Sequence, residues 1–221
     1  MSSDVLVKLR EDYRDRTKVV WRVYFGNGTS LTDAEVVRSV YDLKDSNCSE
    51  LQYLEDVKYA DFGHDEYLND SSFLSGMKSL EVLIISGSPI KDLSPLSQCK
   101  NLRILEIANC GYITDLSPLE DCESLEMLNI SHTKATEGLS ALEERNMTHL
   151  TAVGGIWNKI SQEDRDAFQE DHPDCWIVTS GNEYGVGWRY EDKETKMEWY
   201  EKASEAFKYP HAPNNVGWYL E

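Results

Sequence analysis

Apolar residues in the middle of the chain return at a nearly constant interval. The segments 80–101, 102–124 and 125–149 share one spacing, in which a leucine is followed three and five residues later by further apolar residues. The positions of this column set are Leu80, Leu83, Ile85, then Leu102, Leu105, Ile107, then Leu125, Leu128, Ile130. The pentapeptide DLSPL also occurs twice, at 92–96 and at 115–119. Such self-similarity predicts stacked structural units rather than one irregular core.

A period of 20–29 residues with the spacing L-x-x-L-x-L is typical of leucine-rich repeats. Each unit is one turn of a coil, and stacked turns bury the leucines that a single turn would leave in water. The predicted fold class is α/β, a right-handed leucine-rich repeat solenoid with a parallel β-sheet on the concave face and caps at both ends. Strands near 82–85, 104–107, 127–130 and 152–155 are expected to pair in parallel, in sequence order.

The pentapeptide DLSPL is interpreted as the return of the coil on its convex side. Its two leucines point inward, while Asp and Ser can cap a short helical turn and Pro fixes φ where no amide is needed. The longer matches, Ile90 to Leu96 and Ile113 to Leu119, both read I-x-D-L-S-P-L.

With these residues the chain resembles the bacterial internalin-like class of leucine-rich repeats, over roughly residues 54–160. The resemblance implies a curved solenoid in a family that mostly binds proteins. The family's asparagine ladder is represented here by Ser88, Cys110 and Thr133, and only then by Asn158, so a weaker buried amide network is expected.

Three regions are predicted: an N-terminal cap over 1–53, four to five repeat turns over 54–160, and a C-terminal cap with an aromatic-rich tail over 161–221. Residues 19–29 are expected to form a strand and a turn, Ser161 is expected to cap a helix, and 191–209 has a helical pattern. The tail carries Trp188, Trp199 and Trp218, which either bury as a cap or form a stacking surface for sugars or a peptide.

Five cysteines show no CxxC pair, which argues against a zinc site or a disulfide framework. Cys99 and Cys122 occupy the same column of adjacent turns, and Cys110 lies at the ladder position. Small buried thiols suit these positions, and Cys175 is expected in the core. A disulfide between Cys99 and Cys122 and a metal site are the alternatives.

The formal net charge is −18, most of it after residue 50. This charge disfavours nucleic acid as a partner and favours a basic protein, although solubility alone also explains it. No apolar run is long enough to span a bilayer, and the first twenty residues lack a signal-peptide core. The expected location is the cell surface or secretion if an export signal was removed, and the cytoplasm otherwise.

Sequence motifs for catalysis are missing: there is no phosphate-binding loop, no GxSxG elbow and no HExxH. The triplet His64-Asp65-Glu66 is interpreted as a solvated loop rather than a metal site. The expectation is therefore a protein that is not an enzyme and needs no cofactor.

Residues between the inward leucines of each strand point outward on the concave face. An apolar patch with a polar rim on such a face is typical of a contact site. The predicted partner-binding residues are Val82, Ile84, Ile104, Glu106, Met127, Asn129, His132 and Trp157. The predicted function is a non-catalytic protein-interaction module; the alternatives are a tail that covers this patch, and a cell-envelope carbohydrate binder that uses the tail aromatics.

Overall fold

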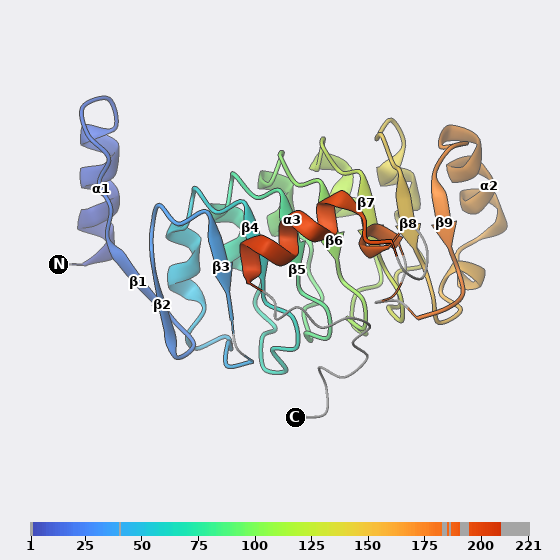
Figure 1. Ribbon diagram of the computed structural model, residues 1–221, viewed down its shortest axis with the longest axis horizontal. Coiled ribbons are helices and arrows are strands. Elements are labelled where there is room, and N and C mark those ends of the chain that lie inside the picture. The colour runs from blue at the N-terminus through green and yellow to red at the C-terminus, as the bar shows by residue number, and fades with distance from the viewer. Residues whose placement is uncertain (1, 40, 183–184, 186, 191–194, 209–221) are drawn as a thin grey trace.

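The computed structural model of the protein describes residues 2–39, 41–182, 185, 187–190 and 195–208. The chain forms an elongated solenoid with a seven-stranded parallel sheet in sequence order (Figure 1). Its strands are β3 (Val36–Arg38), β4 (Tyr59–Asp61), β5 (Val82–Ile84), β6 (Ile104–Glu106), β7 (Met127–Asn129), β8 (His149–Thr151) and β9 (Trp176–Val178). The predicted repeat fold with parallel, sequential strands is confirmed.

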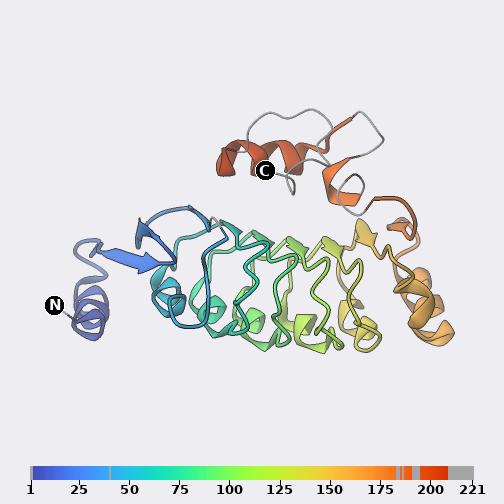
Figure 2. The ribbon, with the colours of Figure 1, turned by 90° about the horizontal axis from the view of Figure 1, so that it is seen from below.

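Short 3-10 helices line the side of the coil opposite the sheet (Figure 2). They are η1 (Ser49–Tyr53), η2 (Ser72–Gly76), η3 (Ser94–Gln98), η4 (Ser117–Asp121), η5 (Leu139–Leu142) and η6 (Trp157–Lys159). The DLSPL segments begin η3 and η4: Oδ1 of Asp92 accepts a hydrogen bond from the Ser94 amide at 2.8 Å, and Asp115 does the same for Ser117. The aspartate, rather than the serine, therefore caps each convex return.

The core is a set of side-chain columns running along the solenoid. Leu83 pairs in register with Leu105, and Leu105 pairs with Leu128; all three are at most 1% exposed. Because every strand of the seven-stranded sheet is only three residues long, most stabilisation comes from burial between turns rather than from any one turn.

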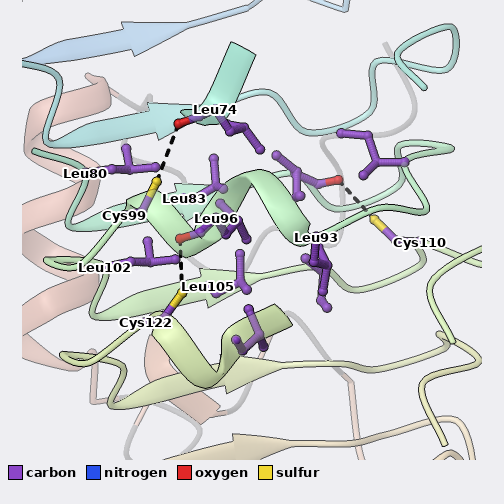
Figure 3. Packing of buried hydrophobic residues seen from close by; sticks show 14 of the residues in the cluster. Leu74, Leu80, Leu83, Leu93, Leu96, Cys99, Leu102, Leu105, Cys110 and Cys122 are labelled. Carbon is purple, nitrogen blue, oxygen red and sulfur yellow. Dashed lines mark hydrogen bonds between the residues drawn. The ribbon is translucent and has the colours of Figure 1, made fainter. Parts of the chain in front are cut away.

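The cysteines extend these columns (Figure 3). Each thiol bonds a carbonyl of the preceding turn: Cys99 bonds Leu74 at 3.5 Å, and Cys122 bonds Leu96 at 3.4 Å. Both thiols are free and fully buried. Burial raises the pKa of each to about 12, so they serve as small core residues, as expected.

The ladder position lies four residues after the end of each strand, and four successive turns place four different residues there. Cys110 donates from Sγ to the carbonyl of Ile85 at 3.2 Å, Ser88 donates to the carbonyl of Phe62 at 3.2 Å, and Thr133 bonds within its own turn. Asp65 is the equivalent residue one turn earlier, since it follows its strand at the same spacing. Asn158, expected on this ladder, instead lies exposed in η6.

Asp65 is therefore a core residue, and its assignment to a solvated loop is wrong. It is fully buried and accepts hydrogen bonds from the Ser39 hydroxyl and from the Leu43 amide. Burial raises its pKa to about 6. The neighbouring His64 and Glu66 differ from it: His64 is half-buried, and Glu66 alone is exposed.

The outer turns are shifted by three residues from the predicted register. Leu150 pairs with Leu128, not with the column of Leu125, so β8 begins at His149. The cause is the apolar spacing itself: Met147, Leu150 and Val153 repeat every three residues, so a shift of three preserves the apolar match. The sequence therefore allows two registers for this turn, and the observed pairing of β7 with β8 decides between them.

The sheet continues beyond the predicted repeat range, since β3 precedes residue 54 and β9 follows residue 160. The N-terminal end adds α1 (Ser3–Tyr13) and an antiparallel hairpin of β1 (Arg22–Phe25) and β2 (Gly28–Leu31), which includes the predicted strand and turn. At the other end, Ser161 Oγ accepts from the Asp164 amide at 3.0 Å and caps α2 (Gln162–Asp171), as predicted.

The last described elements return along the solenoid. A short turn, η7 (Gly187–Arg189), contacts β7, β8 and β9, and helix α3 (Glu198–Phe207) contacts β3 and β4. Both views place α3 across the sheet, on the side away from the 3-10 helices (Figures 1 and 2). Within the described residues, no helix combines the length and hydrophobicity needed to cross a bilayer.

Candidate functional site: a covered concave face

The concave face consists of two outward-pointing columns of the sheet. The first residue of each strand forms one column, through Tyr59, Val82, Ile104 and Met127. The third residue forms the other column, through Asp61, Ile84, Glu106 and Asn129. Val82, Ile84, Ile104 and Met127 are called the concave patch, and they are four of the five apolar residues predicted for this face, the fifth being Trp157.

Helix α3 covers the concave patch. Ala203 and Phe207 of α3 are buried in one cluster with the four patch residues, and Met197, Trp199 and Tyr200 pack against it. The Phe207 ring meets the Tyr59 ring edge-on, with centroids 6.3 Å apart. Each patch residue is at most 5% exposed. We call η7 and α3 together the docked segment.

The prediction that these side chains form an open patch is therefore wrong. The expected columns of outward residues exist, but the chain's own C-terminal segment fills the space in front of them. The alternative weighed from the sequence, a tail that covers the face, describes the observed arrangement. Its physical cause is the apolar stripe of α3, formed by Tyr200, Ala203 and Phe207 at helical spacing.

A buried ion pair fixes the docked segment at the centre of the sheet. Arg189 donates from Nε to Oε2 of Glu106 at 2.9 Å and from its terminal NH2 to Oε1 at 2.6 Å. Ser86 adds a hydrogen bond to Oε1 at 3.0 Å. Glu106 is fully buried, so its charge is compensated chiefly by this bidentate contact. Removing one partner of such a pair leaves an uncompensated buried charge.

Gly187 allows the backbone of η7 to rest directly on the sheet. Its φ is +72°, and a Cβ at this position would overlap Oγ1 of Thr151 in β8. Both the left-handed conformation and the close approach therefore require glycine. Among the described residues, the neighbours of a Cβ at Gly185, two residues earlier, are atoms of Asn182 at ordinary van der Waals distance.

Trp199 lies between two cations. The Arg103 guanidinium is 4.5 Å from the ring centroid, and Lys202 Nζ is 4.9 Å from the same ring. Arg103 is itself held by Glu126 through contacts of 2.7 and 2.8 Å. The Arg103 contact holds Trp199, and with it α3, against the sheet, whereas the Lys202 contact lies within α3. Trp218 and the Trp188 side chain lie outside the described residues, so a stacking surface shared by the three tryptophans stays a prediction.

The predicted polar rim divides into a buried and an exposed part. Asn129 is 1% exposed, and its Oδ1 accepts from the Ser131 amide at 3.1 Å. His132 is exposed and has a φ of +57°. It belongs to a column of turn residues with positive φ that also includes His64, Gly87, Asn109 and Gly154. His64 and His132 thus share a left-handed backbone conformation at the same position of their turns.

Trp157 does not belong to the concave face, and its predicted place there is wrong. It begins η6, is 9% exposed, and packs edge-on against Phe168 of α2 at 6.3 Å. The three-residue shift of this turn explains the error, because it moves Trp157 from the strand column into the C-terminal core.

The pKa shifts of titratable groups at the site are caused chiefly by burial and not by a cluster of catalytic side chains. Burial raises the pKa of Tyr200 and lowers the pKa of His64. Among the described residues, no group of three His, Cys, Asp or Glu side chains is placed to hold a metal ion. The chemistry that the arrangement offers is recognition through apolar contact and one charged pair.

Sequence reasoning missed Arg189, Gly187 and Phe207 as site residues. The stripe of α3 was a usable signal, since its outer positions Glu198 and Glu205 are exposed while Phe207 is buried. The pairing of Arg189 with Glu106 had no local signal, because the two residues are 83 positions apart.

A family model described as leucine-rich repeats, in two copies, matches residues 78–121. No curated protein matches the chain. Among solved structures, internalin C2 from Listeria monocytogenes has a TM-score of 0.51 and 24% identity, over 61% of this chain and 56% of that one. A leucine-rich repeat protein from Leptospira interrogans has a TM-score of 0.56 and 20% identity, over 66% of this chain and 37% of that one.

The functional domain of InlJ from Listeria monocytogenes, which includes a cysteine ladder, has a TM-score of 0.50 and 14% identity, over 68% and 40% of the two chains. The chain thus spans between 37% and 56% of the length of these three structures. Folds of this kind generally serve as protein-interaction modules. Residues 78–121 therefore carry leucine-rich repeats, and the solenoid of this chain is similar in fold to that of internalin C2.

Proposed function

We propose that the protein is a non-catalytic interaction module whose concave face binds a protein partner in place of the docked segment. The binding residues are Val82, Ile84, Ile104, Glu106, Met127 and Asn129, with His132 at the exposed rim. The observation that carries the proposal is that this face already buries a polypeptide segment through an apolar cluster and a buried ion pair. A surface able to bind one segment in this way has the chemistry to bind another.

The docked segment acts as a competitor for the partner in this proposal. Among the described side chains of the segment, Ala203 and Phe207 are buried on the patch, and each such apolar side chain contributes on the order of 1–3 kcal/mol. The partner's apparent affinity is its intrinsic affinity reduced by the fraction of chains that are open. Release of the segment would return Glu106 to water, so opening leaves no buried unpaired charge.

Electrostatics favour a basic partner. The net charge of −18 attracts cationic surfaces and accelerates their approach. Glu106 adds a specific requirement, since an occupant without a cation would bury this carboxylate without the positive charge that Arg189 now supplies.

The test compares full-length variants in a photo-crosslinking capture with quantitative mass spectrometry. Gly187→Ala should open the concave face, and Gly185→Ala is the matched control because its Cβ position is unobstructed. A protein bound at the face should be captured more by Gly187→Ala than by the control. The capture should disappear when Met127→Glu is added to the open variant.

Circular dichroism and thermal melting of each variant must show a folded solenoid. Equal capture by the open variant and by its Met127→Glu derivative would contradict binding at the concave patch. Capture of nothing by any of the variants would also contradict the proposed function.

A further inference from the structure

Resting on the proposed function, we infer that the partner presents an amphipathic α-helix with an arginine on its N-terminal side. The docked segment is the chain's internal copy of that ligand. Helix α3 supplies the apolar stripe, and Arg189 supplies the cation that pairs with Glu106. The inference specifies the class of ligand that this face selects.

The backbone of the sheet excludes an added strand as the mode of recognition at this face. Every strand from β4 to β8 is paired on both sides, so the concave patch offers side chains but no free backbone donors or acceptors. A β-strand ligand needs an open sheet edge, whereas a helix needs only a complementary apolar surface. The patch therefore favours a ligand that satisfies its own backbone hydrogen bonds.

The stripe of α3 shows what such a ligand has to present. Tyr200, Ala203 and Phe207 follow one another at intervals of three and four residues and face the patch. The small Ala203 lies between two aromatic residues, which lets the helix axis approach the sheet. The opposite side is polar and carries an exposed Glu198–Lys202 ion pair of 2.6 Å.

Glu106 selects arginine in particular. Its two oxygens accept from two nitrogens of one guanidinium, and only arginine offers this planar fork. The Met197 amide donates to the Arg189 carbonyl at 3.0 Å, which ties the arginine turn to the start of α3. A ligand with a lysine at this place would satisfy the charge but only one of the two contacts.

A labelled synthetic peptide with the sequence of residues 187–208 tests the inference by fluorescence anisotropy. It is titrated with full-length wild type, Gly187→Ala and the control Gly185→Ala. We expect binding to Gly187→Ala at least tenfold tighter than to the other two chains, in which the face is occupied. Hydrogen exchange of α3 in Gly187→Ala verifies that the internal segment has been released.

Peptide variants test the two features separately. Arg189→Glu in the peptide should weaken binding to Gly187→Ala at least tenfold, and a Glu106→Arg chain should prefer this charge-reversed peptide to the parent. Ala203→Pro in the peptide, which breaks the helix, should weaken binding by a similar factor. Glu106→Arg also opens the face by itself, so the test does not depend on Gly187→Ala alone.

The inference would be overturned if the peptide did not bind a chain whose segment is released. It would also be overturned if the Ala203→Pro peptide or the Arg189→Glu peptide bound as tightly as the parent peptide. Dimers of the open chain in light scattering, lost in Glu106→Arg, would make a second copy the occupant and would overturn it too. If the peptide does not bind but the capture experiment finds a protein at the concave face, only the inference of a helical ligand is rejected. If the peptide binds but no protein is captured, the proposed function is rejected.

Discussion

The central turns of the solenoid and the docked segment are both buried, but they are specified in different ways. Leu83, Leu105 and Leu128 repeat one another along a column, so each position is supported by identical neighbours. The docked segment instead depends on single residues, namely Gly187, Arg189 and Phe207, each with its own partner. Repetition yields a cooperative stack, whereas a few individual contacts yield a unit that can be released by itself.

The largest expected effect lies in the stack. Leu105→Ala removes a fully buried side chain and should lower the free energy of unfolding by roughly 2–5 kcal/mol. Because neighbouring turns depend on one another, urea denaturation should show one transition for the whole stack of turns. A loss under about 1 kcal/mol would mean that the column does not carry the stability we assign to it.

A pH-dependent effect is expected from Asp65, which belongs to the stack but is charged. Its pKa is raised from 3.8 to about 6, so between these values the folded state holds a proton that the unfolded state lacks. Raising the pH through this window therefore favours unfolding, by roughly 2–3 kcal/mol in total. Below the window the penalty is absent.

Asp65→Asn removes the titration: its Oδ1 can still accept from the Leu43 amide, while its Nδ2 donates to the Ser39 hydroxyl oxygen in place of the present bond. The difference in unfolding free energy between variant and wild type should therefore grow from pH 4 to pH 6 and stay constant above it. Urea titrations at unit pH intervals measure this difference. A difference that does not change with pH would refute the assignment of a raised pKa to Asp65.

A smaller and local effect is expected at the ion pair. Arg189→Met leaves Glu106 without its cation, and the cheapest response is release of the docked segment, since release rehydrates the carboxylate. The population of released chains should rise at least about tenfold, seen as a red shift of Trp199 emission. The control Lys208→Met, which removes an exposed cation directly after α3, should give a much smaller shift.

Thiol labelling compares the accessibility of cysteines in the central turns with that of Cys175 and needs no destabilising substitution. Cys99, Cys110 and Cys122 are buried with pKa values of about 12, whereas Cys175, beyond the central turns, is partly exposed. In native protein at pH 8, Cys175 should react first and the three stacked thiols only as the chain unfolds. Early labelling of Cys99 or a Cys99–Cys122 disulfide by mass spectrometry would contradict this order.

The stacked turns of the solenoid could be predicted from the repeated spacing of the sequence. The docked segment, which depends on single contacts, could hardly be predicted. The columns through Leu83 and Leu105 follow directly from spacing, because each turn must present the same side chains to its neighbours. The outer turns were shifted because apolar residues three apart, such as Met147 and Leu150, match their neighbours in two registers. That shift placed Trp157 on the wrong face.

The candidate site was predicted in part. The outward positions Val82, Ile104 and Met127 follow from strand alternation, and they do form one apolar patch. What covers them was not predictable from a pattern, because the contact between Arg189 and Glu106 joins residues 83 positions apart. Glu106, which lies beside Ile84, Ile104 and Met127, was the remaining signal that a cation binds at this face.

The most direct test asks whether the docked segment is an occupant or an integral cap. Hydrogen–deuterium exchange of Gly187→Ala, Gly185→Ala and wild type resolves α3 from the strands β5, β6 and β7. The account predicts that Gly187→Ala accelerates exchange in α3 at least tenfold while the backbone amides of these strands stay as protected as in the other two chains. Loss of protection in the strands together with α3, or unchanged exchange in α3, would contradict it.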